Sequence, residues 1–305
     1  MTDRTFSSSD YSCASSLNLN IGIRGFAVKR SDASIFAVSD SDRCIAGMGP
    51  SWSGVGMNGA LAGKTALVTG GSRGIGRAIV ESFVAAGATV FFTYLSGQAE
   101  ADFMLAKIDP TLNALHPVKA DVSDERSILN LFEQIDAYGQ LDILVNNAGV
   151  ILEKPLLSTT AEEFDWLLNI NLRGMFLCGR EGLRRMAGRP GRVINISSDL
   201  SFTGRESFSI YCASKGAINA LTKSWAQEFS PEVLVNAIAP GPIETDMLDI
   251  ENMSPEWRLK EEELTQLKRI GRPEEISSLA LFLAGDGASY ITGQIIGPNG
   301  GSVMP

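Results

Sequence analysis

The chain has 305 residues, 44% of them hydrophobic, which suits one globular α/β domain with a buried sheet. Its 26 basic and 35 acidic residues give a net charge of −9, so nonspecific binding to nucleic acid or to an anionic membrane is disfavoured. One histidine and four cysteines without metal-ligand spacing offer almost nothing for a zinc site or a Ser-His-Asp hydrolase, and we expect a metal-free metabolic protein of the reducing cytoplasm.

Residues 1–56 differ in composition from the rest of the chain. They are serine-rich, carry five acidic and five basic residues and show no helical or strand period, so we predict disorder. They lack the apolar core of a secretory signal, and their acids are atypical of a transit peptide, although organelle targeting stays open. Met57 opens M-N-G-A-L-A-G-K-T, a natural beginning for a domain, so a start codon placed too early is an alternative explanation. We therefore separate this extension from one domain, residues 57–305.

From residue 65 onward, apolar strand-like segments alternate with helical segments through short connections. This alternation predicts a doubly wound parallel sheet of the Rossmann type, with helices on both faces. Buried parallel strands are apolar throughout. We predict seven strands, which are apolar except at the edges of the sheet: residues 65–69, 89–94, 115–120, 143–146, 192–197, 234–239 and 294–297. Ligands bind beyond the carboxyl ends of such strands, so the residues that follow them are candidates for a site.

A glycine-rich turn, T-G-G-S-R-G-I-G, follows the first predicted strand and leads into an amphipathic helix. Gly70, Gly74 and Gly76 stand where the backbone must turn sharply and approach a pyrophosphate, and a helix beginning near Ile75 presents free amides to that anion. The spacing differs from the common G-x-G-x-x-G pattern, but a strand before and a helix after favour dinucleotide binding. The alternative is a turn that only punctuates the chain.

The end of the second predicted strand bears on which nucleotide is used. An acid about 20 residues beyond the glycine turn is typical of NAD binding, and Tyr94, Leu95 and Ser96 occupy that place instead. Arg73 in the turn can pair with a 2′-phosphate, so we predict NADP(H) in preference to NAD(H). A solvated loop cation is the alternative for Arg73.

Tyr211 and Lys215 stand four residues apart in Y-C-A-S-K, with Ser198 thirteen residues upstream of the tyrosine. On a helix this spacing puts the phenol and the ammonium on one face. A cation about 5 Å from a phenol, at an effective dielectric of about 20, lowers the phenol pKa by about two units. We therefore predict that Tyr211 exchanges protons with a substrate. A core tyrosine beside a solvated lysine is the alternative for the pair taken alone.

The order of these motifs resembles that of the short-chain dehydrogenase/reductase family, in particular its bacterial 3-oxoacyl-[acyl carrier protein] reductase branch. The resemblance extends from about Met57 to the C-terminus. Its motifs are Thr69 to Gly76, Asp121 with Val122, Asn146 to Gly149 in N-N-A-G, Asn171 in N-L-R-G, Ser198, Tyr211 with Lys215, and Pro240 to Thr245 in P-G-P-I-E-T. The closing I-T-G-Q-I-I-G-P-N-G-G also resembles that branch.

The resemblance implies four catalytic residues. Tyr211 donates the proton, Ser198 holds the carbonyl oxygen, Lys215 binds the nicotinamide ribose, and Asn171 positions a water that connects Lys215 to solvent. Ser198 can instead be a cap or turn residue, and Asn171 can simply bond to the backbone.

The resemblance also implies a cofactor-binding set and no metal. Its members follow the carboxyl ends of strands: Gly70, Ser72, Arg73, Gly74, Ile75, Gly76, Asp121, Val122, Asn147, Ala148, Gly149, Tyr211, Lys215, Pro240, Gly241, Ile243 and Thr245. Asp121 can equally be a helix cap, and the asparagines can be turn residues that support the sheet.

The predicted activity is NADPH-dependent reduction of a carbonyl to a secondary alcohol, with a 3-oxoacyl thioester favoured. A sugar, polyol or general ketone reductase is the alternative, and a dinucleotide-binding sensor or scaffold is the non-enzyme alternative. Asp199 and Glu232 depart from the reductase branch, and the charge of Asp199 near the pocket weighs against a purely apolar substrate.

Two segments bear on the substrate and its carrier. A lid over residues 242–269 contains Met247, Leu248, Met253 and Trp257, which fit an apolar substrate or ordinary packing. Acyl carrier protein is acidic, and Arg184, Arg185, Arg189 and Arg192 form a candidate basic patch for it, or a solvated helix end. By resemblance alone, the chain forms a homotetramer through the long helices that follow the fourth and fifth strands.

Overall fold

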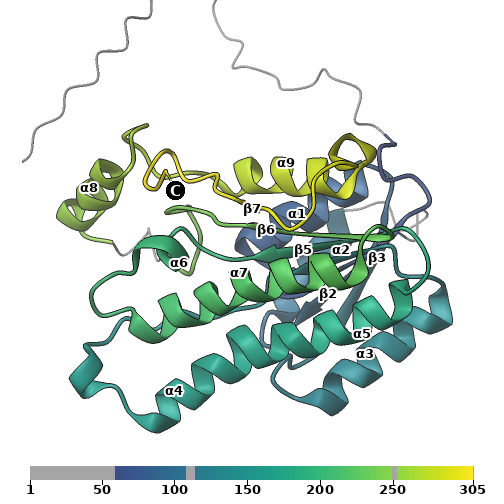
Figure 1. Ribbon diagram of the computed structural model, residues 1–305, viewed down its shortest axis with the longest axis horizontal. Helices are drawn as coiled ribbons and strands as arrows, with labels where there is room; N and C mark the ends of the chain where they lie inside the picture. Colours follow the sequence, from purple (N-terminus) through teal and green to yellow (C-terminus); the bar gives the residue numbers. More distant parts are fainter. Residues whose placement is uncertain (1–58, 108–113, 249–252, 305) are drawn as a thin grey trace, which may run out of the picture. The chain divides into compact units, whose positions relative to one another are not determined.

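The computed structural model describes residues 59–107, 114–248 and 253–304; the disorder predicted for residues 1–56 lies outside the described residues. Seven parallel strands form one sheet in the order β3-β2-β1-β4-β5-β6-β7 (Figure 1). The strands are β1 (Thr65–Val68), β2 (Thr89–Tyr94), β3 (Leu115–Lys119), β4 (Ile143–Asn146), β5 (Gly191–Ile196), β6 (Val233–Ile238) and β7 (Ile295–Ile296). Each boundary lies within one residue of its prediction, and the doubly wound Rossmann-type sheet is confirmed.

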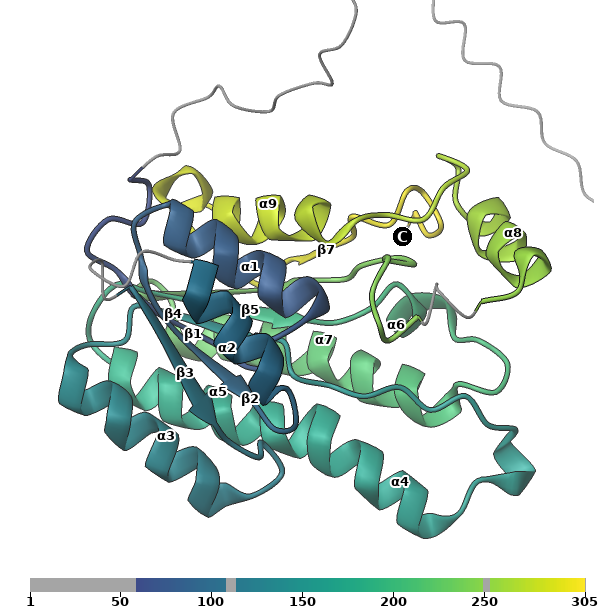
Figure 2. The same cartoon turned by 180° about the vertical axis from the view of Figure 1, so that it is seen from behind.

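Helices cover both faces of the sheet, as Figures 1 and 2 show from opposite sides. One layer contains α1 (Gly74–Ala85), α2 (Gln98–Lys107) and α9 (Pro273–Ala284); the other contains α3 (Glu125–Tyr138), α5 (Met175–Met186) and α7 (Ser209–Phe229). Each layer closes its own apolar core against the sheet. The carboxyl ends of β1, β4, β5 and β6 therefore meet at one edge between the two layers.

Local sequence explains why α3 forms where it does. Ile128, Leu131, Phe132 and Ile135 recur at helical spacing and are all buried against the sheet. Asp124 precedes the helix, and its carboxylate accepts hydrogen bonds from the first-turn amides, so the helix begins there.

Shorter elements complete the fold, and all but η4, which precedes β7, lie towards the carboxyl edge of the sheet. They are η2 (Leu156–Ser158), α4 (Ala161–Leu168), the π-helical turn η3 (Asn169–Gly174), α6 (Leu200–Thr203), α8 (Pro255–Leu264) and η4 (Asp286–Ala288). A capping box of Thr160 and Glu163 begins α4, and Ser254 caps α8. In Figure 1, α6 and α8 lie together at the left end of the sheet.

Two findings concern membrane spans and metal sites in the described part of the chain. None of its helices combines the length and the apolar character needed to cross a bilayer. In the same part of the chain, no cluster of three or more His, Cys, Asp or Glu side chains is placed to ligate a metal.

Candidate active site

The glycine turn after β1 is fixed by close backbone contacts. Gly70 and Gly74 adopt φ of +65° and +53°, which favour glycine. At Gly76, a Cβ atom would lie 2.1 Å from the Gly70 carbonyl oxygen, so only glycine fits. The Asn147 side-chain amide donates to the carbonyls of Thr69 and Gly70, each at 2.9 Å, and so joins the turn to the end of β4.

This turn fits the phosphates of a dinucleotide. Helix α1 begins at Gly74, and the first amides of a helix have no intrahelical acceptor. Arg73 stands at the N-cap without a capping side-chain bond, and the first turn contains no acid. The positive end of the helix dipole is therefore directed at the turn, as an anion requires.

The region beyond β2 contains an acid, Glu100, that the sequence pattern did not indicate. A Cβ added at Gly97 would lie 2.6 Å from Ser72 Oγ and 3.3 Å from Glu100 Oε2, so both side chains approach the same point. Glu100 is in the first turn of α2, 24 residues past Gly76, whereas the usual acid stands about 20 residues past the turn, at the end of the second strand. Its carboxylate lies beside the turn that carries Arg73.

The four residues predicted to be catalytic come from three elements and lie around one point. Ser198 follows β5, Tyr211 and Lys215 are on α7, and Asn171 is in η3. All four are buried. A Cβ at Gly149 would lie 3.2 Å from Asn171 Oδ1 and 3.7 Å from Lys215 Nζ, so these two side chains border the segment that follows β4.

Contacts join Lys215, Tyr211 and Ser198. Lys215 Nζ lies 5.7 Å from the centroid of the Tyr211 ring and donates to the Ile196 carbonyl at 2.8 Å. A hydrogen bond connects Tyr211 with the Ser198 hydroxyl and favours the phenolate. The structure therefore places the phenol and the ammonium on one face of α7, as the spacing predicted.

The predicted direction of the Tyr211 pKa shift is wrong. Burial raises the pKa of Tyr211 to about 12, although its hydrogen bond with Ser198 acts in the opposite direction, and the nearby Asp199 raises it further. Burial also lowers the pKa of Lys215 to about 8. Desolvation disfavours the charged form of both groups, and it exceeds the attraction on which the prediction depended. Tyr211 is consequently a protonated acid at neutral pH.

Several residues of the predicted cofactor set have structural bonds of their own. Asp121 accepts from the Ser123 amide at 2.8 Å and from the Ser123 hydroxyl at 2.7 Å, which makes it a turn residue; Asp124 is the cap. Asn146 donates to Asn195 Oδ1 at 2.9 Å between β4 and β5. These contacts show the structural part of the roles left open above, and nucleotide binding by these residues stays a prediction.

The segment from Pro240 to Thr245 packs beside the glycine turn. A Cβ at Gly74 would lie 3.2 Å from Thr245 Cγ2, and the Pro240 carbonyl accepts from the Asp199 amide at 2.9 Å. Ile243 forms a bridge with Gly271. The segment from Pro240 to Thr245 therefore lies next to the glycine turn, although 170 residues separate Gly70 from Pro240.

One contact of the candidate lid is an ion pair that the sequence did not reveal. Arg205 donates to both carboxylate oxygens of Glu261, which is buried in α8, and its NH1 group lies 3.1 Å from Oε2. The same guanidinium lies 5.4 Å from the Trp257 ring centroid and 5.2 Å from that of Phe208. Met247, expected over the substrate or in packing, is exposed.

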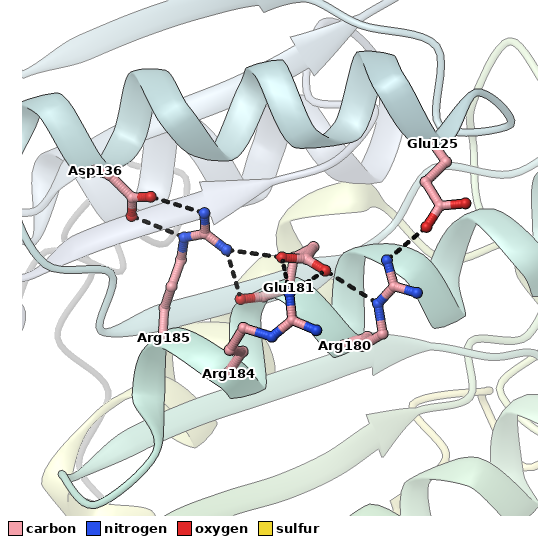
Figure 3. Close-up of polar contacts among 6 residues, drawn as sticks. All are labelled: Glu125, Asp136, Arg180, Glu181, Arg184 and Arg185. Carbon is pink, nitrogen blue, oxygen red and sulfur yellow. Dashed lines mark hydrogen bonds and ion pairs between the residues drawn. The ribbon is translucent and has the colours of Figure 1, made fainter.

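The arginines proposed as a carrier-docking patch do not border this site. Arg184 and Arg185 bind the buried Glu181, and Arg185 also binds Asp136 of α3 (Figure 3). Arg189 pairs with Asp142. These residues belong to the end of α5 and the loop before β5, and Arg192 begins β5, whereas Ser198 follows the opposite end of that strand. The run is basic, as predicted, but three of its arginines pair with acids, and none of the four lies at the carboxyl edge of the sheet where Ser198 stands.

The sheet order, the glycine turn and the grouping of Tyr211, Lys215 and Ser198 define a dinucleotide-binding oxidoreductase. Residues 70–302 match a family model described as enoyl-(acyl carrier protein) reductase. The chain belongs to the short-chain dehydrogenase/reductase family.

Individual relatives agree with this assignment. The chain is 43% identical to a 3-oxoacyl-[acyl-carrier-protein] reductase of Aquifex aeolicus over 247 residues, which are 79% of this chain and 98% of that one. A putative gluconate dehydrogenase from Agrobacterium tumefaciens superposes with a TM-score of 0.76 at 34% identity, covering 80% of this chain and 98% of that one. A blue fluorescent protein from a metagenomic library, solved with NADPH, has the same TM-score and identity, covering 80% and 100%.

Proposed function

We propose that residues 57–305 form a cytoplasmic reductase domain that uses NADPH to reduce a carbonyl to a secondary alcohol, with a 3-oxoacyl thioester as the favoured substrate. The observation that carries the proposal is the convergence of Tyr211, Lys215, Ser198 and Asn171 beside the glycine turn. Similarity to a 3-oxoacyl-[acyl-carrier-protein] reductase supports the substrate class. We also propose an acyl carrier protein as the substrate's carrier and a homotetramer as the assembly.

The nucleotide, when bound, supplies a hydride to the carbonyl carbon. The chain supplies the proton: Tyr211 is protonated at neutral pH, so its phenol donates to the oxygen on which negative charge develops. The Ser198 hydroxyl, which already bonds to Tyr211, stabilises the same oxygen. Charge on that oxygen grows during the reaction, so a fixed donor contributes more in the transition state than in the ground state.

Lys215 and Asn171 are the remaining two residues of the site, and both lie next to Gly149. The Ile196 carbonyl holds the Lys215 ammonium next to Gly149, where it can bind a ribose hydroxyl of the nucleotide. After Tyr211 gives up its proton, the phenolate is stabilised by that same cation. Asn171, in η3, fixes the backbone at Val150 through two hydrogen bonds.

NADPH is proposed over NADH because Arg73 is exposed at the start of α1 and no acid occupies the end of β2. A solved relative binds NADPH, which supports the choice. Glu100 opposes it, since its carboxylate reaches the neighbourhood of Ser72. The preference therefore depends on the balance between one guanidinium and one carboxylate.

A sugar or polyol reductase is the second candidate function, and Asp199 is the specific observation in its favour. This carboxylate directly follows Ser198, and its charge near the pocket favours a polar substrate over an apolar one. Similarity to a putative gluconate dehydrogenase points the same way.

One experiment separates the candidates. Oxidation of NADPH and of NADH is followed with acetoacetyl thioester, simple ketones and sugars as substrates. Turnover of the thioester with NADPH supports the proposal, and preference for sugars supports the second candidate. Binding of NADPH without turnover of any carbonyl would instead indicate a dinucleotide sensor.

A further inference from the structure

Asp199 is a buried carboxylate that contacts both Ser198 and Ser302, a residue near the C-terminus. Only 6% of its surface is exposed, and it stands at the start of α6 directly after Ser198. Its Oδ1 atom accepts from the Ser198 hydroxyl at 3.2 Å, and its Oδ2 atom accepts from the Ser302 hydroxyl at 2.6 Å. Two serines 104 residues apart (198 to 302) thus hold one carboxylate in a fixed orientation.

The charged groups around Asp199 leave its negative charge largely uncompensated. Tyr211 and Cys212 face it from α7, Arg205 from the loop before α7, and Glu261 from α8. Arg205 is the one cation of this group, and both carboxylate oxygens of Glu261 already bind it. Among the described residues, no ion pair involves Asp199. The negative charge of Asp199 therefore disfavours ionisation of the neighbouring Tyr211 phenol.

The Ser198 hydroxyl has one proton and two acceptors within reach. Its oxygen accepts from the Leu200 amide at 3.2 Å, so the hydroxyl proton points away from that amide. That proton can go to Asp199 Oδ1 or to the Tyr211 oxygen. An ionised carboxylate is the stronger acceptor, so before substrate binds the Ser198 proton is directed to Asp199 and does not stabilise a Tyr211 phenolate. A substrate oxygen that gains negative charge competes for the same proton.

We propose that Asp199 is a positioning residue: it orients the Ser198 hydroxyl and opposes ionisation of Tyr211, so that alcohol oxidation by this site requires a higher pH than it would without the carboxylate. Reduction needs a phenol that donates a proton, whereas oxidation needs a phenolate that accepts one. A carboxylate beside the phenol opposes the phenolate, and burial strengthens that effect. The assignment of direction rests on the proposed function, but the effect on Tyr211 does not.

The first test needs no substrate. The full chain is titrated towards alkaline pH while tyrosinate absorbance is followed, and the curve of Tyr211→Phe is subtracted to isolate Tyr211. Circular dichroism defines the pH range over which the fold persists. Tyr211 should ionise at a lower pH in Asp199→Asn than in the natural chain. The substitution keeps the shape of the side chain and one of its two acceptor oxygens, and it removes the charge.

Ser302→Ala is the matched control, because it removes a hydrogen bond from Asp199 without removing the charge. The carboxylate stays in place beside Ser198 in this variant, so the Tyr211 titration should stay close to that of the natural chain. The same Tyr211 ionisation in Asp199→Asn and in the natural chain would overturn the proposal. Should Asp199→Asn fail to fold, Asp199→Ser, which keeps a hydroxyl for Ser302, is titrated in the same way.

The second test measures direction. In Asp199→Asn, the alkaline pH at which alcohol oxidation reaches half its maximum should fall by about one unit, with a smaller change in the pH profile of reduction. Equal losses in both directions at every pH would show a merely structural role. If no carbonyl or alcohol is turned over by any variant, the proposed function fails while the titration still decides the role of Asp199.

Discussion

The side-chain amide of Asn171 forms a reciprocal pair of hydrogen bonds with the backbone of Val150: Oδ1 accepts from the amide at 2.8 Å, and Nδ2 donates to the carbonyl at 2.8 Å. Asn171 lies in the π-helical turn η3, and Val150 lies just beyond β4. π-Helical turns are rare and occur often at functional sites. This one aims a buried amide at the segment on which the proposed nucleotide site depends.

Asn171→Ala should lower the free energy of unfolding by about 1–3 kcal/mol, because both backbone groups of Val150 lose their partner. Urea denaturation measures the change. Asn169→Ala, at an exposed position of the same turn, is the control and should shift the free energy by less than about 0.5 kcal/mol. Unchanged stability of Asn171→Ala would show that the pair contributes nothing to the fold.

Tyr211→Phe should abolish carbonyl reduction and leave NADPH affinity nearly intact, because it removes the proton donor and keeps the buried ring. A loss of about 100-fold or more in kcat is expected for a general acid. Steady-state rates and fluorescence titration with NADPH measure the two quantities. Tyr290→Phe removes a hydroxyl from a fully exposed ring and serves as the control. Retained turnover with weakened NADPH binding would reverse the assignment.

Lys215 should make stability depend on pH in a defined window. Burial lowers its pKa from 10.5 to about 8. Between these values the unfolded chain binds a proton that the folded chain does not, so the free energy of unfolding contributed by this group rises with pH. Below about pH 8 the folded state carries the full cost of the buried charge.

Lys215→Met should therefore gain stability relative to the natural chain near pH 7 and lose that advantage as the pH approaches 10.5. Denaturant unfolding at a series of pH values measures the difference. Lys223→Met, at an exposed position of the same helix, should show no such trend. A difference that is constant over this window would contradict the burial-driven shift.

The fold was predictable because its signals are local. Apolar runs of four to six residues mark the buried strands, and glycines with a helix after them mark the nucleotide turn. The grouping of Tyr211 and Lys215 also follows from helical spacing and needs no tertiary information.

The features that the sequence could not predict depend on the burial of side chains and on contacts between residues far apart in the chain. The sign of the Tyr211 pKa shift required knowing that both the phenol and the ammonium are desolvated. The pairing of Arg205 with Glu261 joins residues 56 positions apart that carry no shared motif. The basic run at Arg184 reads as a free patch until the buried Glu181 is seen beneath it (Figure 3).

Glu181→Gln should lower the free energy of unfolding by about 3–5 kcal/mol, the range for breaking a buried charge pair. The Glu181 side chain is only 2% exposed, and it receives Arg180, Arg184 and Arg185 together. Denaturant unfolding measures the loss. Glu125→Gln removes an exposed partner of Arg180 and should leave stability nearly unchanged. Equal effects of the two substitutions would show that burial of Glu181 does not matter.

Glu100→Gln should tighten NADPH binding and leave NADH binding unchanged. Its carboxylate approaches the same point as Ser72, where a 2′-phosphate beside Arg73 would be repelled. An exposed charge interaction of about 0.4–1 kcal/mol corresponds to a gain of about two- to fivefold in affinity. Fluorescence titrations with both nucleotides measure it, and the gain should shrink at high salt. Asp102→Asn makes the same charge change on the same helix, so an equal gain there would point to net charge rather than to the position of Glu100.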